Sequence, residues 1–148
     1  MASVRGCPVP DDRLYEPEQL LWYRRRDDGL VEVGITAIAV AMVRKIIAVT
    51  PKRHGRPIEA GQAVAVVESG KLVASARTPF AAFVVESNED LLDHPDRVNR
   101  DPYGTWVVIL RYDDWAAVEA KLVNADAAAA AFEQRMVEEN FRGGCEGP

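Results

Sequence analysis

The sequence predicts a mainly β fold: a sandwich or flattened barrel of short antiparallel strands, with a short internal helix and helices near the C-terminus. Short runs of Val, Ile and other apolar residues are separated by Gly, Pro and Asp turns throughout residues 20–112. One of these runs, residues 106–110, is continuously apolar, as in a strand buried on both faces. Beyond residue 112, aspartates precede alanine-rich segments, which is typical of capped helices.

Size and charge limit the class of protein. The chain has 148 residues, of which 48% are hydrophobic and 28% charged, and this length suits one domain that buries about two-thirds of its unfolded surface. No apolar run approaches the roughly 20 residues that span a bilayer, and the first residues lack the apolar core of a signal peptide. We therefore expect a cytoplasmic monomer that binds no membrane. A net charge of −5 argues against a nucleic-acid surface, although residues 24–26 and 52–56 are locally basic.

Four segments are expected along the chain. Residues 1–19 carry Pro8 and Pro10 without periodicity, which predicts an irregular arm. A β domain is expected over 20–112, with helices over 113–142 packed on it and a tail over 143–148.

The first strands and the internal helix follow from local patterns. Residues 20–23 begin the ordered part, and 24–29 form the turn of a first hairpin. The alternation over 31–35 predicts a strand. Thr36 can cap a short helix over 37–42, although periodicity alone does not separate that helix from a buried strand. Residues 46–49 then form a short strand that Thr50 and Pro51 close.

Residues 64–76 predict a second hairpin. Two β-favouring runs flank Ser69 and Gly70, which are residue types that turn a chain sharply. Lys71 then lies at the tip. A lysine on a turn is also what an ordinary solvated loop contains, so this pattern alone leaves both interpretations open.

Another strand is expected over 78–85, followed by a turn over 101–104. Asp113 and Asp114 can cap a helix over 115–123, and Asp126 can cap a second through 127–131. Phe132, Met136 and Val137 of that second helix share one stripe, which we expect to face the core. Gly143 and Gly144 are expected to end the helix.

Residues for catalysis are scarce. His54 and His94 lie in loop-like segments without the spacing of metal ligands, and there is no Cys-x-x-Cys pair or glycine-rich phosphate loop. The chain is therefore not expected to be an enzyme with its own catalytic site. A carrier protein, in contrast, needs only one attachment residue on an exposed tip.

The hairpin supports a carrier more specifically. Glu68-Ser69-x-Lys71, followed by small residues and Pro79, resembles the lipoyl-lysine hairpin of the H protein of the glycine cleavage system. Three further segments resemble that family in the same order: 29–36, 88–95 and 99–106. The resemblance therefore covers roughly residues 20–140.

The resemblance implies a lipoyl-domain fold and a covalent cofactor. Lipoate would be attached to Lys71 by lipoate-attaching enzymes, and Glu68 would help these enzymes recognise the hairpin. Biotin carriers flank their lysine with methionines, where this chain has Gly70 and Leu72. Lipoyl domains of 2-oxoacid dehydrogenases usually have Asp-Lys-Ala at the tip, which this chain also lacks.

Departures from the H-protein pattern suggest a particular type of carrier. Leu20-Leu21-Trp22 replaces His-Glu-Trp, Arg44-Lys45 replaces a common Gly-Asp pair, and Ala82 replaces glycine. The added ends around Cys7 and Cys145 resemble the lipoate-binding proteins of the heterodisulfide-reductase-like sulfur oxidation pathway. We therefore expect a carrier in sulfur oxidation that serves this reductase-like complex and dihydrolipoyl dehydrogenase. The alternative is an H protein that carries an aminomethyl group among the glycine cleavage enzymes.

An alternative of another class is an unmodified interaction scaffold, against which the intact Glu68-x-x-Lys71 spacing argues.

Cys7 and Cys145 lie near opposite ends of the chain. Domain termini often lie close together, so the two thiols can meet, but a cytoplasmic protein is expected to keep them reduced. They could also react with a sulfur-bearing intermediate.

Overall fold

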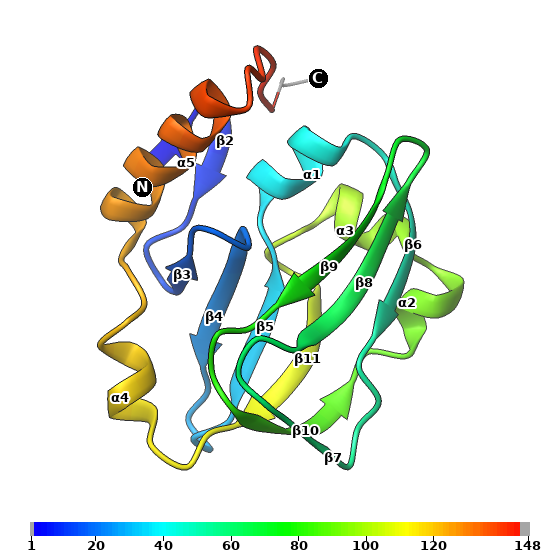
Figure 1. Cartoon of the computed structure of the whole chain (residues 1–148), viewed down its shortest axis with the longest axis vertical. Coiled ribbons are helices and arrows are strands. Elements are labelled where there is room, and N and C mark those ends of the chain that lie inside the picture. The colour runs from blue at the N-terminus through cyan, green and yellow to red at the C-terminus, as the bar shows by residue number, and fades with distance from the viewer. Residues whose placement is uncertain (1, 146–148) are drawn as a thin grey trace.

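Two β-sheets pack against each other in the computed structural model, which describes residues 2–145 (Figure 1). All strand pairs within the described residues are antiparallel, and the prediction of a mainly β fold is confirmed. The larger sheet has the order β3-β4-β5-β11-β10-β7, the smaller has the order β6-β8-β9, and β1 pairs with β2. The strands are β1 (Ala2–Val4), β2 (Cys7–Val9), β3 (Leu14–Glu16), β4 (Leu21–Arg25), β5 (Val31–Ile35), β6 (Ile46–Pro51), β7 (Arg56–Ile58), β8 (Ala63–Ser69), β9 (Val73–Arg77), β10 (Ala82–Ser87) and β11 (Trp106–Arg111).

The core lies between the two sheets. Strand β11 runs between β5 and β10, and its four residues from Val107 to Leu110 are buried, as the continuous apolar run predicts. Val49 and Val64 of the smaller sheet belong to the same hydrophobic cluster. Fully burying each such side chain contributes about 1.5–3 kcal/mol. The smaller sheet is therefore fixed on the larger one by a shared core.

Five helices complete the described residues: α1 (Ala37–Val43), α2 (Asp90–Asp93), α3 (Asp96–Arg100), α4 (Trp115–Glu119) and α5 (Ala125–Glu138). The predicted internal helix is confirmed as α1, because the Thr36 side chain accepts a hydrogen bond from the backbone N–H of Ala39. Helix α5 packs against the β1–β2 pair, which places both ends of the chain at one side of the molecule (Figure 1).

The N-terminal segment is ordered, so the prediction of an irregular arm is wrong. Strands β1 and β2 form a hairpin whose turn holds Arg5 and Gly6, both with positive φ. Cys7 and Val9 are fully buried in the hydrophobic core. The two prolines suggest irregularity, but the burial of alternate residues of β2 outweighs them.

The first C-terminal helix is shorter than predicted. Asp114 caps α4 by accepting a hydrogen bond from Ala117, but the helix ends at Glu119 rather than at 123. Val123 exchanges two backbone hydrogen bonds with Tyr15, of 2.9 and 3.0 Å, and therefore adopts an extended conformation.

The second C-terminal helix also differs in its details. Asn124, not Asp126, caps α5, through a 2.9 Å hydrogen bond from the N–H of Ala127. The helix ends at Glu138, before the glycine pair that was expected to end it, and Asn140 supplies the left-handed turn with φ of 55°. Phe132 and Met136 face the core, but Val137 is 64% exposed, so the predicted stripe is wrong at that position.

Candidate functional site

Lys71 lies at the tip of the β8–β9 hairpin, as the sequence predicts. The side-chain oxygen of Ser69 accepts hydrogen bonds from the backbone N–H groups of Lys71 and Leu72, at 3.2 and 3.3 Å. The N–H of Ser69 donates to the carbonyl of Leu72 at 2.9 Å, which closes the turn. The serine thus holds the backbone of the tip, because its hydroxyl accepts the two N–H groups in place of a backbone carbonyl.

The tip is accessible. Lys71 is exposed, and no atom beyond Gly70 and its two chain neighbours lies within 4 Å of the position that a Cβ on Gly70 would take. Among the described residues, Lys71 forms no ion pair or side-chain hydrogen bond. Glu68 is exposed on the same hairpin. An unpaired, exposed amine on a turn that Ser69 closes fits the covalent attachment of a group, because an enzyme can reach it without unfolding the strand.

A scaffold behind the hairpin fixes its position. Strand β6 pairs with β8, and the side-chain amide of Asn99 bonds both backbone groups of Ile46, where β6 begins, at 3.0 and 2.8 Å. Asp101 accepts a hydrogen bond from the N–H of Gly104 in the following turn. The Asn99 side chain therefore anchors the start of β6, the strand that pairs with the hairpin.

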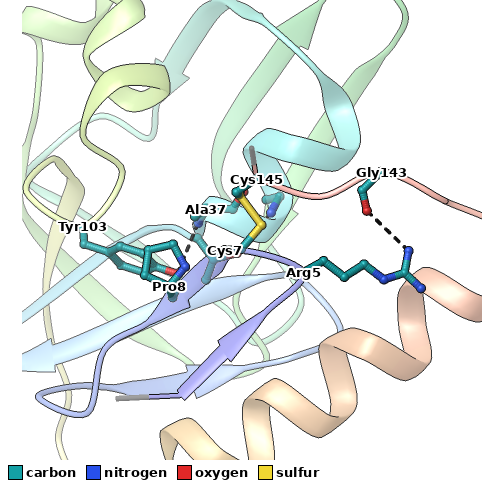
Figure 2. Close-up of a disulfide and its surroundings, with 9 residues drawn as sticks. Arg5, Cys7, Pro8, Ala37, Tyr103, Gly143 and Cys145 are labelled. Carbon is teal, nitrogen blue, oxygen red and sulfur yellow. Dashed lines mark hydrogen bonds between the residues drawn. A yellow bond between two sulfur atoms is a disulfide. The ribbon is translucent and has the colours of Figure 1, made fainter. Parts of the chain in front are cut away.

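Aromatic residues connect this scaffold to the N-terminal hairpin. The hydroxyl of Tyr103 donates to the carbonyl of Pro8 at 2.6 Å and accepts from the N–H of Ala37 at 3.3 Å (Figure 2). Burial raises the pKa of Tyr103 to about 12, which keeps this hydroxyl a donor. Trp22 packs on Gly34 so closely that a Cβ there would lie 2.3 Å from the indole ring, and its N–H donates to Pro102.

A groove of about 870 Å³ lies beside the lysine. The hairpin contributes one wall through Lys71 and Leu72, and the end of α1 contributes Met42 and Arg44. The chain after α5 contributes further lining residues, from Asn140 to Gly144. Leu21, which stands where the related family has a glutamate, also lines this groove.

The sequence analysis did not predict that several charged residues lie together in this groove. Arg44, Arg135 and Arg142 line it together with the acidic residues Glu18 and Glu139. Arg135 pairs with Glu139 and also donates to the backbone carbonyl of Glu18. The signal for Arg44 was its place at a position where glycine is common, but nothing in the sequence brought Arg142 to the same groove.

The two cysteines are joined by a disulfide, so the expectation of reduced thiols is wrong for this structure. Their Cα atoms are 4.7 Å apart (Figure 2). The N–H of Cys145 donates to the carbonyl of Arg5 at 3.0 Å, and the Arg5 guanidinium donates to the carbonyls of Phe141 and Gly143. These contacts hold residues 141–145, which we call the tail segment, against the body.

Within residues 2–145, no group of three or more His, Cys, Asp or Glu side chains is arranged to hold a metal ion. None of the helices in this part of the chain is long and apolar enough to cross a membrane.

Known proteins resemble this chain over most of its length. Residues 13–135 match the profile of the family described as "Glycine cleavage H-protein". "Glycine cleavage system H protein 5" of Aquifex aeolicus is 35% identical over 97% of this chain and 100% of that protein. "Glycine cleavage system H protein" of Burkholderia ambifaria is 36% identical over 80% of this chain and 93% of that protein.

A solved structure shows the same fold. The crystal structure of a glycine cleavage system H protein from Mycobacterium marinum superposes with a TM-score of 0.71 and 28% sequence identity. The match covers 82% of this chain and 97% of the other.

Proposed function

Because the chain belongs to the glycine cleavage H-protein family, whose members carry covalently attached lipoate, we propose that it is a lipoyl carrier with lipoate on Lys71. The observation that carries this assignment is the exposed, unpaired lysine on a hairpin tip held by Ser69. Glu68 is proposed to be read by the lipoate-attaching enzyme, since it is exposed on the same hairpin and can be contacted together with the lysine.

The division of work between protein and cofactor follows from the site. Lipoate supplies a disulfide-containing ring that reacts with a transferred group. The hairpin fixes the point of attachment, and the long flexible arm allows the carried group to visit several enzymes at high effective concentration. The chain is proposed to have no catalytic site of its own. A cytoplasmic location stays a prediction.

The names of the relatives favour the enzymes of glycine cleavage as partners, because both curated proteins described above are named for that system. This supports the function that sequence reasoning held as its alternative: an H protein that carries an aminomethyl group. The expected role in sulfur oxidation has no such support from the names.

One feature of the groove favours the sulfur oxidation carrier as a second candidate. An aminomethyl group is an amine that is cationic near neutral pH, whereas the groove beside Lys71 is lined by two arginines without an ion-pair partner among the described residues, Arg44 and Arg142, and by one unpaired glutamate, Glu18. Incubating the lipoylated protein with glycine and the glycine-decarboxylating component of a cleavage system separates the candidates. A gain of one aminomethyl group in the intact mass supports glycine cleavage, and its absence favours the second candidate.

The attachment site is tested by substitution. Lys71→Arg keeps the charge and the exposed position but removes the amine that is acylated. After co-expression with a lipoylating system, the wild-type protein and the matched control Lys121→Arg should each gain one lipoyl group in the intact mass, and Lys71→Arg should gain none. Continued modification of the Lys71→Arg protein would show that another lysine is used.

A further inference from the structure

We propose that the groove beside Lys71 is an anion-binding site, in which Arg44 and Arg142 take a small oxyanion, a carboxylate or sulfur oxyanion, carried on the arm. This inference rests on the proposed function as a lipoyl carrier and adds the charge class of the carried group, which agrees with the second candidate above and not with the aminomethyl carrier. Lys71 itself lines the groove, so a group attached to the lysine begins at its wall.

The charge balance of the groove carries the proposal. Five charged residues besides Lys71 line it, three arginines and two glutamates. Arg135 and Glu139 neutralise each other in an ion pair. Arg44 and Arg142 form no ion pair among the described residues, which leaves two cations against the single carboxylate of Glu18. Acylation of Lys71 removes its own charge, so these arginines are the positive charges that remain for a ligand.

Arg44 provides a second, independent observation. It follows the last residue of α1 with φ of 68° and ψ of −148°, a region of backbone space that almost only glycine occupies. A residue with a Cβ in such a conformation costs on the order of 1–3 kcal/mol. The presence of an arginine there despite this cost is consistent with a use for its guanidinium, which binds oxyanions with a planar pair of donors.

Arg142 reaches the groove because the tail segment is fixed. The disulfide and the backbone hydrogen bond from Cys145 to Arg5 hold one end of this segment. Gly144 passes so near Arg5 that a Cβ there would lie 2.3 Å from the Arg5 carbonyl oxygen. The guanidinium of Arg5 binds the carbonyls on both sides of Arg142, those of Phe141 and Gly143. The position of Arg142 is thereby set by its neighbours on both sides.

The experiment uses the lipoylated protein with arms of different charge. The lipoyl ring is reduced by dihydrolipoyl dehydrogenase and NADH, which adds two electrons and two protons to give two thiols. These thiols are then alkylated with iodoacetate, iodoacetamide or 2-bromoethylamine, which release halide and a proton and leave negative, neutral or positive groups. Intact mass confirms one lipoyl group and two alkyl groups. Melting temperature and the backbone amide shifts of Arg44 and Arg142 report docking.

We expect the carboxymethyl arm to raise the melting temperature about 2–4 °C above that of the aminoethyl arm, an increase that high salt reduces. The carboxymethyl arm alone should move the amide signals of the two arginines. Arg142→Gln should remove at least half of the difference, whereas Arg53→Gln, an exposed arginine in another groove, should leave it unchanged. Glu18→Gln, which removes the unpaired carboxylate of the groove, should enlarge the difference in melting temperature between the two arms.

Arg44→Gly separates the anion site from folding. Glycine accepts the backbone conformation of residue 44, so the unmodified variant should melt at the same or a higher temperature. It should nevertheless lose at least half of the difference between the carboxymethyl and aminoethyl arms. Equal melting temperatures for the two arms in the wild-type protein, or a preference for the aminoethyl arm, would overturn the anion site while leaving the carrier function intact. Failure of Lys71 to acquire a lipoyl group, seen in the intact mass, would overturn both.

Discussion

At the hairpin tip, one residue stabilises the turn, and other residues are available for contact with a modifying enzyme. Ser69 is buried and holds the turn through its hydroxyl, whereas Glu68 and Lys71 on either side of it are exposed. Exposed side chains without partners contribute little to folding, so substitutions at Glu68 and Lys71 should change modification and leave the fold in place.

Glu68→Ala should slow lipoylation several-fold and shift the melting temperature by no more than about 1 °C, because the carboxylate makes no buried contact. The rate of mass gain with a purified lipoate-attaching enzyme measures the first effect, and thermal unfolding measures the second. Glu86→Ala, at an exposed position of β10, is the matched control and should be lipoylated at the normal rate. An unchanged rate for Glu68→Ala would mean that the enzyme reads the shape of the hairpin alone.

Among the elements, α5 shows how one helix face fixes the C-terminal part. Phe132 is fully buried and meets the ring of Tyr15 edge to face, with 6.0 Å between the ring centres. Val137 lies on the opposite, exposed side. Phe132→Ala should therefore lower the free energy of unfolding by about 3–5 kcal/mol, and Val137→Ala by less than about 0.5 kcal/mol. Urea unfolding measures both, and similar losses for the two variants would contradict this packing.

Elements with strong local signals could be predicted from the sequence. Thr36 specifies the start of α1, the Ser69-Gly70 pair specifies the tip, and the apolar run of β11 specifies a buried strand. The end of α4 could not be predicted, because it depends on the pairing of Val123 with Tyr15, more than a hundred residues away. The same limit applies to the groove: Arg44 and Arg142 line it together because of tertiary contacts that local patterns do not encode.

For the whole molecule, buried tyrosines predict the response to high pH. Burial raises the pKa of all four tyrosines, Tyr15, Tyr23, Tyr103 and Tyr112, that of Tyr103 to about 12. Each folded pKa lies above the unfolded value near 10, so the stabilisation is fully present below pH 10 and is lost as pH rises through the folded pKa.

Between these two pKa values, each tyrosine should lower the free energy of unfolding by about 1.4 kcal/mol per pH unit. Alkaline titration of tyrosinate absorbance should show little ionisation near pH 10 in the folded protein, followed by a cooperative rise on unfolding. Protein in urea should instead titrate near pH 10. A folded protein whose tyrosines ionise near pH 10 would contradict the burial.

The disulfide acts on the molecule as a whole, because 138 positions separate its two cysteines. Closing a loop of this size is expected to contribute on the order of 4–5 kcal/mol in the loop-entropy model. Reductant should therefore lower the melting temperature by about 10 °C or more, and should have no effect on the Cys7→Ser/Cys145→Ser double variant. Thiol titration of the unfolded protein should find no thiols before reduction and two after it. Two thiols before reduction would disprove the bond.

The bond between Cys7 and Cys145 also decides how the protein bears mechanical force. Tension applied to the two chain ends passes from residue 7 to residue 145 through the sulfur atoms, and the strands between them carry none of it. While the bond is intact, the lysine hairpin and its supporting sheet are shielded from stretching, as from any pull by a complex bound at both ends. After reduction this covalent path is gone, and the same tension acts on the noncovalent contacts of β2 and the tail segment.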